Sequence, residues 1–169
     1  MTVQRIATIQ RYIGQSGDTK PAGAVVGSRF VAADTATEYI SIGAAIAATG
    51  VLTLAAQPEV TDEIDIAATN YVFVAEVDAD TNGEIGIGAD AAGALANIVA
   101  AINGTDGWNT ANPDVTAEAT GAGEITLTAI TAGAAGNSIT TVYTNSGLGT
   151  NAFADATLTG GYDEWQVLP

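Results

Sequence analysis

The four basic residues of this 169-residue chain, Arg5, Arg11, Lys20 and Arg29, all lie in its first 29 positions. Only one carboxylate, Asp18, accompanies them, so four cations against one anion give this segment a net charge of +3. The remaining 140 residues hold eighteen carboxylates and no cation, which gives −18. Such an asymmetry predicts a small basic part that binds something and a large acidic body.

The composition excludes the commonest catalytic groups. The chain has no His and no Cys, and Lys20 is its single lysine. Disulfides and thiolate metal sites are therefore excluded, and a serine nucleophile has no imidazole to activate it. A Ser–Lys pair through Lys20 stays open, but the sequence predicts a protein that is not an enzyme. A net charge of −15 also disfavours nucleic acid as a partner, because phosphates attract Lys and Arg.

The expected fold class is α+β: mainly antiparallel β-sheet, with one helix over about 90–103 packed on a sheet face, plus a small N-terminal anchor module. With 47% apolar residues the chain should fold. The uncharged stretch 39–58 is interpreted as two short strands, so no membrane is expected as a partner. Alternating patterns and turn residues predict the strands, which are 28–33, 37–42, 51–54, 63–66, 71–74, 84–87, 115–119, 124–128, 138–143 and 156–159.

The helix has the clearest pattern. Leu95, Ile98, Val99 and Ile102 recur at i, i+3, i+4 and i+7, which places them on one helical face. Asp90 suits an N-cap, and Gly104 suits a C-terminal stop.

One loop resembles the start of a calcium-binding loop. Asp78, Asp80 and Asn82 supply oxygens at positions 1, 3 and 5, Gly83 stands at position 6, and Glu84 follows. Position 12, where a bidentate Glu is expected, is Ala89, so an acidic turn is the alternative. Trp108 and Trp165 are candidates for stacking on sugars, with local packing as the alternative.

Residues 49–161 resemble a module that recurs in structural proteins of tailed-bacteriophage particles. Members read as a G-x-L-T-L strand, a hairpin, I-G-A-D-A-A-x-x-L-A-N-L-x-x-A-I-N, an I-T-L-T-A strand and a closing A-T-L-T-G-G. The corresponding segments here are 50–54, 62–73, 87–103, 124–139 and 156–161. Ala68-Thr69-Asn70 stands where a glycine turn is usual, which bears only on the type of turn. The resemblance implies a structural role and brings no catalytic residues.

The flanks resemble short phage proteins in which a strand ending in Y-I turns directly into a last strand with Trp. Here Tyr39-Ile40 and Trp165 are widely separated in the sequence. We therefore expect an anchor module of residues 1–40, completed by 162–169, with an acidic β-rich body of residues 41–161 inserted into it. The strand near 37–42 should then run antiparallel to the strand near 164–168.

These resemblances imply a virion protein on the outer surface of a phage particle, most simply a head decoration or head-fibre protein. Tail tube, sheath or fibre components and a glycan- or receptor-binding module are the alternatives. The expected partner is another virion protein, such as the major capsid protein, bound through Arg5, Arg11, Tyr12, Lys20 and Arg29. Copies are expected to associate, as a trimer, through the anchor and the apolar segment 42–54.

Overall fold

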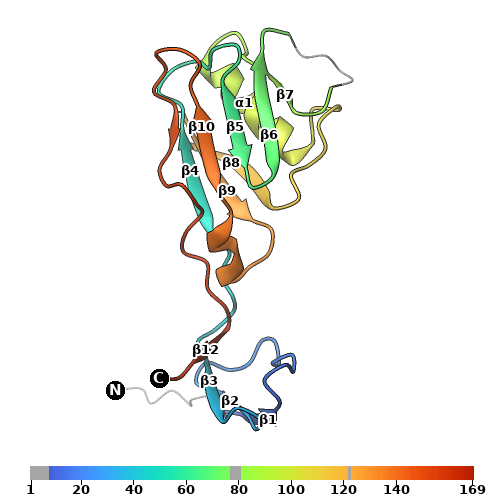
Figure 1. Ribbon diagram of the computed structural model, residues 1–169, viewed down its shortest axis with the longest axis vertical. Coiled ribbons are helices and arrows are strands. Elements are labelled where there is room, and N and C mark those ends of the chain that lie inside the picture. The colour runs from blue at the N-terminus through green and yellow to red at the C-terminus, as the bar shows by residue number, and fades with distance from the viewer. Residues whose placement is uncertain (1–7, 77–80, 122) are drawn as a thin grey trace, which may run out of the picture. The chain divides into compact units, whose positions relative to one another are not determined.

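The computed structural model describes residues 8–76, 81–121 and 123–169. The chain divides into two compact units (Figure 1). The small unit comprises Met1–Ile46 and Tyr162–Pro169, and the acidic unit comprises Ala47–Gly161. The first segment of the small unit thus ends at Ile46, whereas the expected boundary follows residue 40. Three small sheets, mostly antiparallel, and one helix make up 37% strand and 11% helix, which confirms the predicted α+β class.

The charge is distributed unevenly between the two units, but the small unit is not basic overall, which corrects the expectation of a basic anchor module. All four cations and five of the nineteen carboxylates belong to the small unit, which has a net charge of −1. The other fourteen carboxylates belong to the acidic unit, where no cation accompanies them, and its net charge is −14.

The small unit is built on one four-stranded sheet in the order β1-β2-β3-β12. Its strands are β1 (Arg11–Gly14), β2 (Arg29–Ala32), β3 (Thr37–Ser41) and β12 (Trp165–Val167). β12 pairs antiparallel with β3, Trp165 opposite Ser41 and Val167 opposite Tyr39, which confirms the predicted pairing of the two distant segments. β1, which the sequence did not predict, runs parallel to β2 at one edge.

The acidic unit has two four-stranded sheets, in the orders β10-β5-β6-β7 and β11-β4-β9-β8. Most neighbours are antiparallel, but β6 and β7 are parallel. The strands are β4 (Thr49–Thr53), β5 (Glu63–Ile66), β6 (Thr69–Val74), β7 (Glu84–Gly86), β8 (Val115–Gly121), β9 (Glu124–Ala129), β10 (Thr141–Thr144) and β11 (Ala152–Phe153).

Helix α1 (Ala91–Asn103) confirms the predicted helix. The Asp90 side chain accepts a hydrogen bond from the Gly93 amide at 2.8 Å, and Gly104 ends the helix in the left-handed conformation at φ 63°. Its fully buried residues are Ala94, Ile98, Ala101 and Ile102, so the buried face includes small alanines that permit a close approach. The described residues form no helix long and apolar enough to cross a membrane.

One hydrophobic core joins both sheets of the acidic unit to α1. Leu52 and Leu54 belong to this core, at 0% and 6% exposure. They are therefore not available for contacts between copies, which corrects part of the expectation for segment 42–54. Ile42 and Ile46 of the same segment are exposed at 41% and 45%.

Three other expectations need correction. The segment 138–143 begins at the last residue of the 3₁₀ helix η1 (Ala134–Ser138), and the strand β10 starts only at Thr141. The segment 156–159 forms isolated bridges, Thr157 to Thr140 and Thr159 to Thr49, rather than a strand of its own. The turn between β5 and β6 is centred on Ala67 and Ala68, so Thr69 already belongs to β6.

Candidate interaction site

The strand register of the small unit sorts the predicted partner-binding residues onto two faces of its sheet. Tyr12, Phe30 and Tyr39 stand opposite one another on β1, β2 and β3 and therefore share a face. Arg11 precedes Tyr12 on β1, and Arg29 precedes Phe30 on β2. These two arginines also stand opposite one another, and they therefore lie on the other face of the sheet. We call these the aromatic face and the open face.

The aromatic face is covered by the segment that precedes β2. The Trp165 ring packs edge-on against Tyr12 and Phe30, with centroids 6.0 and 6.4 Å apart, and its Nε1–H donates to the Pro21 carbonyl at 3.0 Å. Lys20 Nζ lies 4.0 Å from the centroid of the Tyr39 ring, a cation–π contact. Tyr12 and Lys20 are thus held in the packing of the small unit.

Among the described residues of the small unit, the ring and cation–π contacts all lie on the aromatic face. The open face carries Arg11, Ile13, Arg29, Val31, Glu38, Ile40 and Gln166. Arg29 Nη1 donates to Glu38 Oε1 at 2.7 Å, in a pair about 40% exposed. Arg11 has no ion-pair or hydrogen-bonding side-chain partner among the described residues. Ile13 beside it is 81% exposed. Arg5, the remaining predicted cation, lies outside the described residues.

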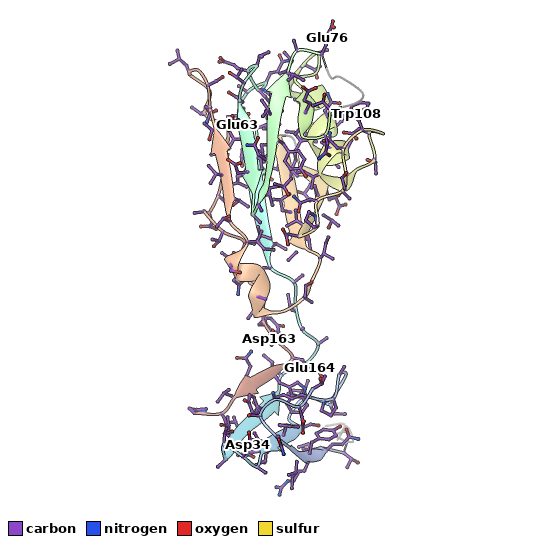
Figure 2. The ribbon with its side chains drawn as sticks, turned by 45° about the vertical axis from the view of Figure 1, so that its right-hand side comes forward. Asp34, Glu63, Glu76, Trp108, Asp163 and Glu164 are labelled. Carbon is purple, nitrogen blue, oxygen red and sulfur yellow. The ribbon has the colours of Figure 1, made fainter. Side chains whose placement is uncertain are left out.

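Four of the five carboxylates of the small unit are bound by groups of the same unit. Glu164 accepts hydrogen bonds from the amides of Gly23 and Ala24 at 3.1 and 2.7 Å (Figure 2 labels it). Asp34 accepts from the Ser16 hydroxyl and amide, which hold the pKa of Asp34 below its ordinary value. Asp18 accepts from the Gln15 amide, and Glu38 pairs with Arg29. Of these four carboxylates, Glu38 is the one that forms an ion pair with a cation of the described residues.

The proposed calcium loop is only partly within the described residues. Asp78 and Asp80 lie outside them. Asn82 Oδ1 accepts a hydrogen bond from the Thr110 amide at 2.7 Å, and Glu84 begins β7. In the described part of the chain, no three His, Cys, Asp or Glu side chains come together to hold a metal ion. Calcium binding stays a prediction.

Sequence reasoning missed a buried polar network in the acidic unit. Asp62, 1% exposed, accepts hydrogen bonds from Tyr143 Oη at 2.8 Å, from the Ser146 amide and hydroxyl at 2.7 and 2.8 Å, and from the Glu59 amide at 3.1 Å. Burial by itself raises the pKa of Asp62, but these hydrogen bonds outweigh it and hold the pKa below its ordinary value. Burial raises the pKa of Tyr143, whose hydroxyl also accepts from Asn151. No pattern in the sequence brings Asp62 and Ser146 together.

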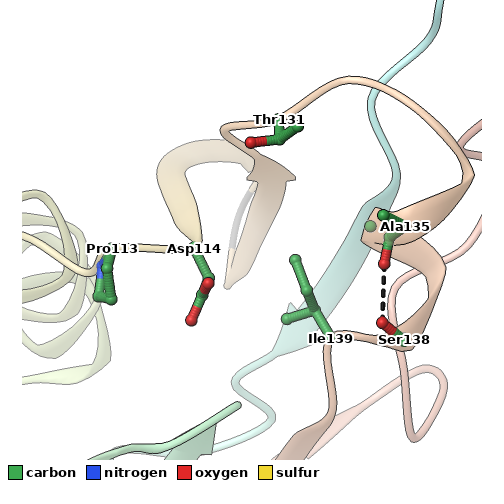
Figure 3. Close-up of a pocket in the computed structure, with 7 residues that line it drawn as sticks. Pro113, Asp114, Thr131, Ala135, Ser138 and Ile139 are labelled. Atoms are coloured by element: carbon green, nitrogen blue, oxygen red, sulfur yellow. Dashed lines mark hydrogen bonds between the residues drawn. The ribbon is translucent and has the colours of Figure 1, made fainter. Parts of the chain in front are cut away.

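The acidic unit has a hollow of about 290 Å³ (Figure 3). Pro113 and Asp114 line one side of it, and Ala135 and Ser138 line the other. The Ser138 hydroxyl donates to the Ala135 carbonyl at 2.8 Å, an ordinary bond within the 3₁₀ turn. Nothing around Ser138 in the described structure activates it as a nucleophile.

The two tryptophans differ in their surroundings. Trp165 is a packing residue of the small unit, as described above. Trp108, labelled in Figure 2, lies in the loop after α1, where Asp106 accepts from the amides of Trp108 and Asn109. Its Nε1 is buried and has no hydrogen-bond partner in the part of the chain that the structure describes. Both rings are partly exposed, and stacking on sugars stays a prediction.

Comparison of the chain with protein-family models, curated proteins and solved structures finds no match.

Proposed function

We propose that the chain is a non-enzymatic structural protein of a tailed-bacteriophage particle, a head decoration or head-fibre protein attached through its small unit. The observation that carries this proposal is the uneven distribution of charge between the two structural units. Every cation belongs to a unit that contains both chain termini, whereas the inserted unit carries fourteen carboxylates and no cation. An acidic body repels its neighbours and stays soluble, which suits a part displayed on a surface.

The partner in this proposal is the major capsid protein, and the attachment residues are those of the open face, with Arg11 first. Phage particles are symmetric assemblies of repeated subunits, so each copy contacts identical neighbours or lies on a symmetry axis. We propose that the copies form a trimer. A tail tube, sheath or fibre position is the rival assignment. The resemblance of residues 49–161 to the phage module supports both positions.

Cryo-electron microscopy of intact particles tests the proposal. We expect density for the acidic unit at regular positions on the outer head surface, and its loss from particles made without the gene. Density on the tail would replace the head assignment by the rival one. Purified particles that contain none of the chain, by mass spectrometry, would overturn the proposal.

A further inference from the structure

β1 is an edge strand whose outer peptide groups face away from the sheet. The Arg29 amide donates to the Gln10 carbonyl at 2.9 Å, and the Ala33 amide donates to the Gly14 carbonyl at 2.8 Å. Peptide groups alternate in direction along a strand, so Gln10, Tyr12 and Gly14 direct theirs towards β2. The peptide groups of Arg11 and Ile13 therefore point away from β2, as a strand-addition site requires.

The side chains of the same two residues lie on the open face. Ile13 is 81% exposed, which is unusual for a β-branched residue in the middle of a strand. Arg11 stands directly opposite Arg29, and like charges at opposed positions are unfavourable. Glu38 pairs with Arg29, so Arg11 is the cation of this face that a carboxylate on a partner can pair with.

We propose that β1 binds an extended segment of a partner protein, which adds as a fifth strand beside β1. The segment carries a carboxylate opposite Arg11 and an apolar side chain opposite Ile13, two residues apart so that both lie on the open face. Main-chain hydrogen bonds to Arg11 and Ile13 supply affinity, and the two side chains supply specificity. That this partner is another protein of the phage particle rests on the proposed function.

Charge argues against a second copy as the occupant. If β1 of another copy added at this edge, two Arg11 side chains would share the open face without a carboxylate between them. The acidic unit of a second copy has two edge strands with a carboxylate, β7 with Glu84 and β8 with Glu118, but neither has an apolar side chain two residues away to lie opposite Ile13. An acidic segment of a different protein supplies both hydrogen bonds to the outer peptide groups of β1 and a carboxylate to pair with Arg11.

Two substitutions separate the contribution of the Arg11 charge from that of the main-chain hydrogen bonds of β1. Arg11→Glu reverses the charge of an exposed side chain and leaves the β1–β2 hydrogen bonds in place. Ile13→Pro removes an amide that points away from β2, and proline is tolerated at such an edge position. Ile13→Val is the conservative control, and Leu148→Glu changes a 98% exposed residue of the acidic unit as the matched control.

The experiment is co-sedimentation of each purified variant with particles that lack the chain, after circular dichroism has shown that the variant is folded. We expect Arg11→Glu and Ile13→Pro to weaken binding roughly tenfold or more, whereas Ile13→Val and Leu148→Glu bind as the wild type does. If the wild type binds and both test variants bind equally well, strand addition is wrong and the proposed function stands. If the wild type does not bind, the proposed function falls and strand addition falls with it. If Ile13→Pro instead dissociates an oligomer of the free chain, the occupant is a second copy and the acidic partner is wrong.

Discussion

Thr49 and Thr159 exchange two backbone hydrogen bonds, each 2.8 Å long. They are the third residue and the third-last residue of the acidic unit. In the small unit, Ile46 and Tyr162 form a bridge of the same kind, with bonds of 2.9 and 3.1 Å. The acidic unit thus begins and ends at one place, which is the condition under which a host fold tolerates an inserted one.

We predict that the acidic unit folds when residues 47–161 are produced alone. Its core is contained within these residues, and its ends are already paired to each other. Differential scanning calorimetry should show one cooperative transition within a few degrees of that of the acidic unit in the full chain. A fragment with strand signal in circular dichroism but no cooperative transition would contradict this.

Asp62 should be the polar residue most important for the stability of the acidic unit. Asp62→Ala leaves four donors without their acceptor, at a cost of roughly 2–4 kcal/mol in the free energy of unfolding. Tyr143→Phe removes one of these bonds and should cost about 1 kcal/mol. Urea unfolding measures both, with Glu118→Ala, an exposed carboxylate, as the control. Equal stabilities for Asp62→Ala and Glu118→Ala would exclude this role.

The contribution of Asp62 should depend on pH in a defined direction. Its pKa in the folded state is lowered below its ordinary value, so folding favours the ionised form. The stabilisation is therefore complete above the unfolded-state pKa and is lost as the pH falls through the folded-state pKa. We expect the difference in unfolding free energy between wild type and Asp62→Asn to be constant from pH 8 to about 5 and to shrink below about pH 4. A difference that grows on acidification would mean that the pKa shift has the opposite sign.

Gly88 should tolerate substitution less well than Gly107, although both have positive φ, of 71° and 97°. A Cβ at Gly88 would lie 2.6 Å from the Ala94 amide nitrogen, at the start of α1. A Cβ at Gly107 would meet nothing within 4 Å. Gly107→Ala therefore costs only backbone strain, about 1–2 kcal/mol. Gly88→Ala should lower the free energy of unfolding by about a further 1–3 kcal/mol, because α1 must shift to make room for the Cβ. Thermal unfolding of the two variants compares them directly.

The elements with strong local signals were predictable from sequence. The helix had an apolar stripe, an Asp cap and a glycine stop, and the β5 segment Glu63–Ile66 had strict alternation. β1 lacked such a signal, because its most apolar residue, Ile13, faces the open side while Tyr12 is covered. The parallel pairing of β6 with β7 was equally hidden, since alternation carries no information about strand direction.

The candidate site was predictable only in part. The clustering of cations in the first 29 residues is visible in the sequence, but their division between two faces depends on the register of β1 with β2. Lys20 illustrates this, since its cation–π contact with Tyr39 joins residues from a loop and a strand. The Asp62 network likewise joins residues more than 80 positions apart, at a distance where no local pattern operates.

The insertion also determines how the acidic unit could be lost. A domain carried at one end of a chain is released by a single backbone cleavage in its linker. Here two segments lead into the acidic unit, one on either side of it, between Ile46 and Thr49 and between Thr159 and Tyr162. A protease that cuts one of them leaves the unit covalently attached through the other, so shedding requires two cuts in the same molecule.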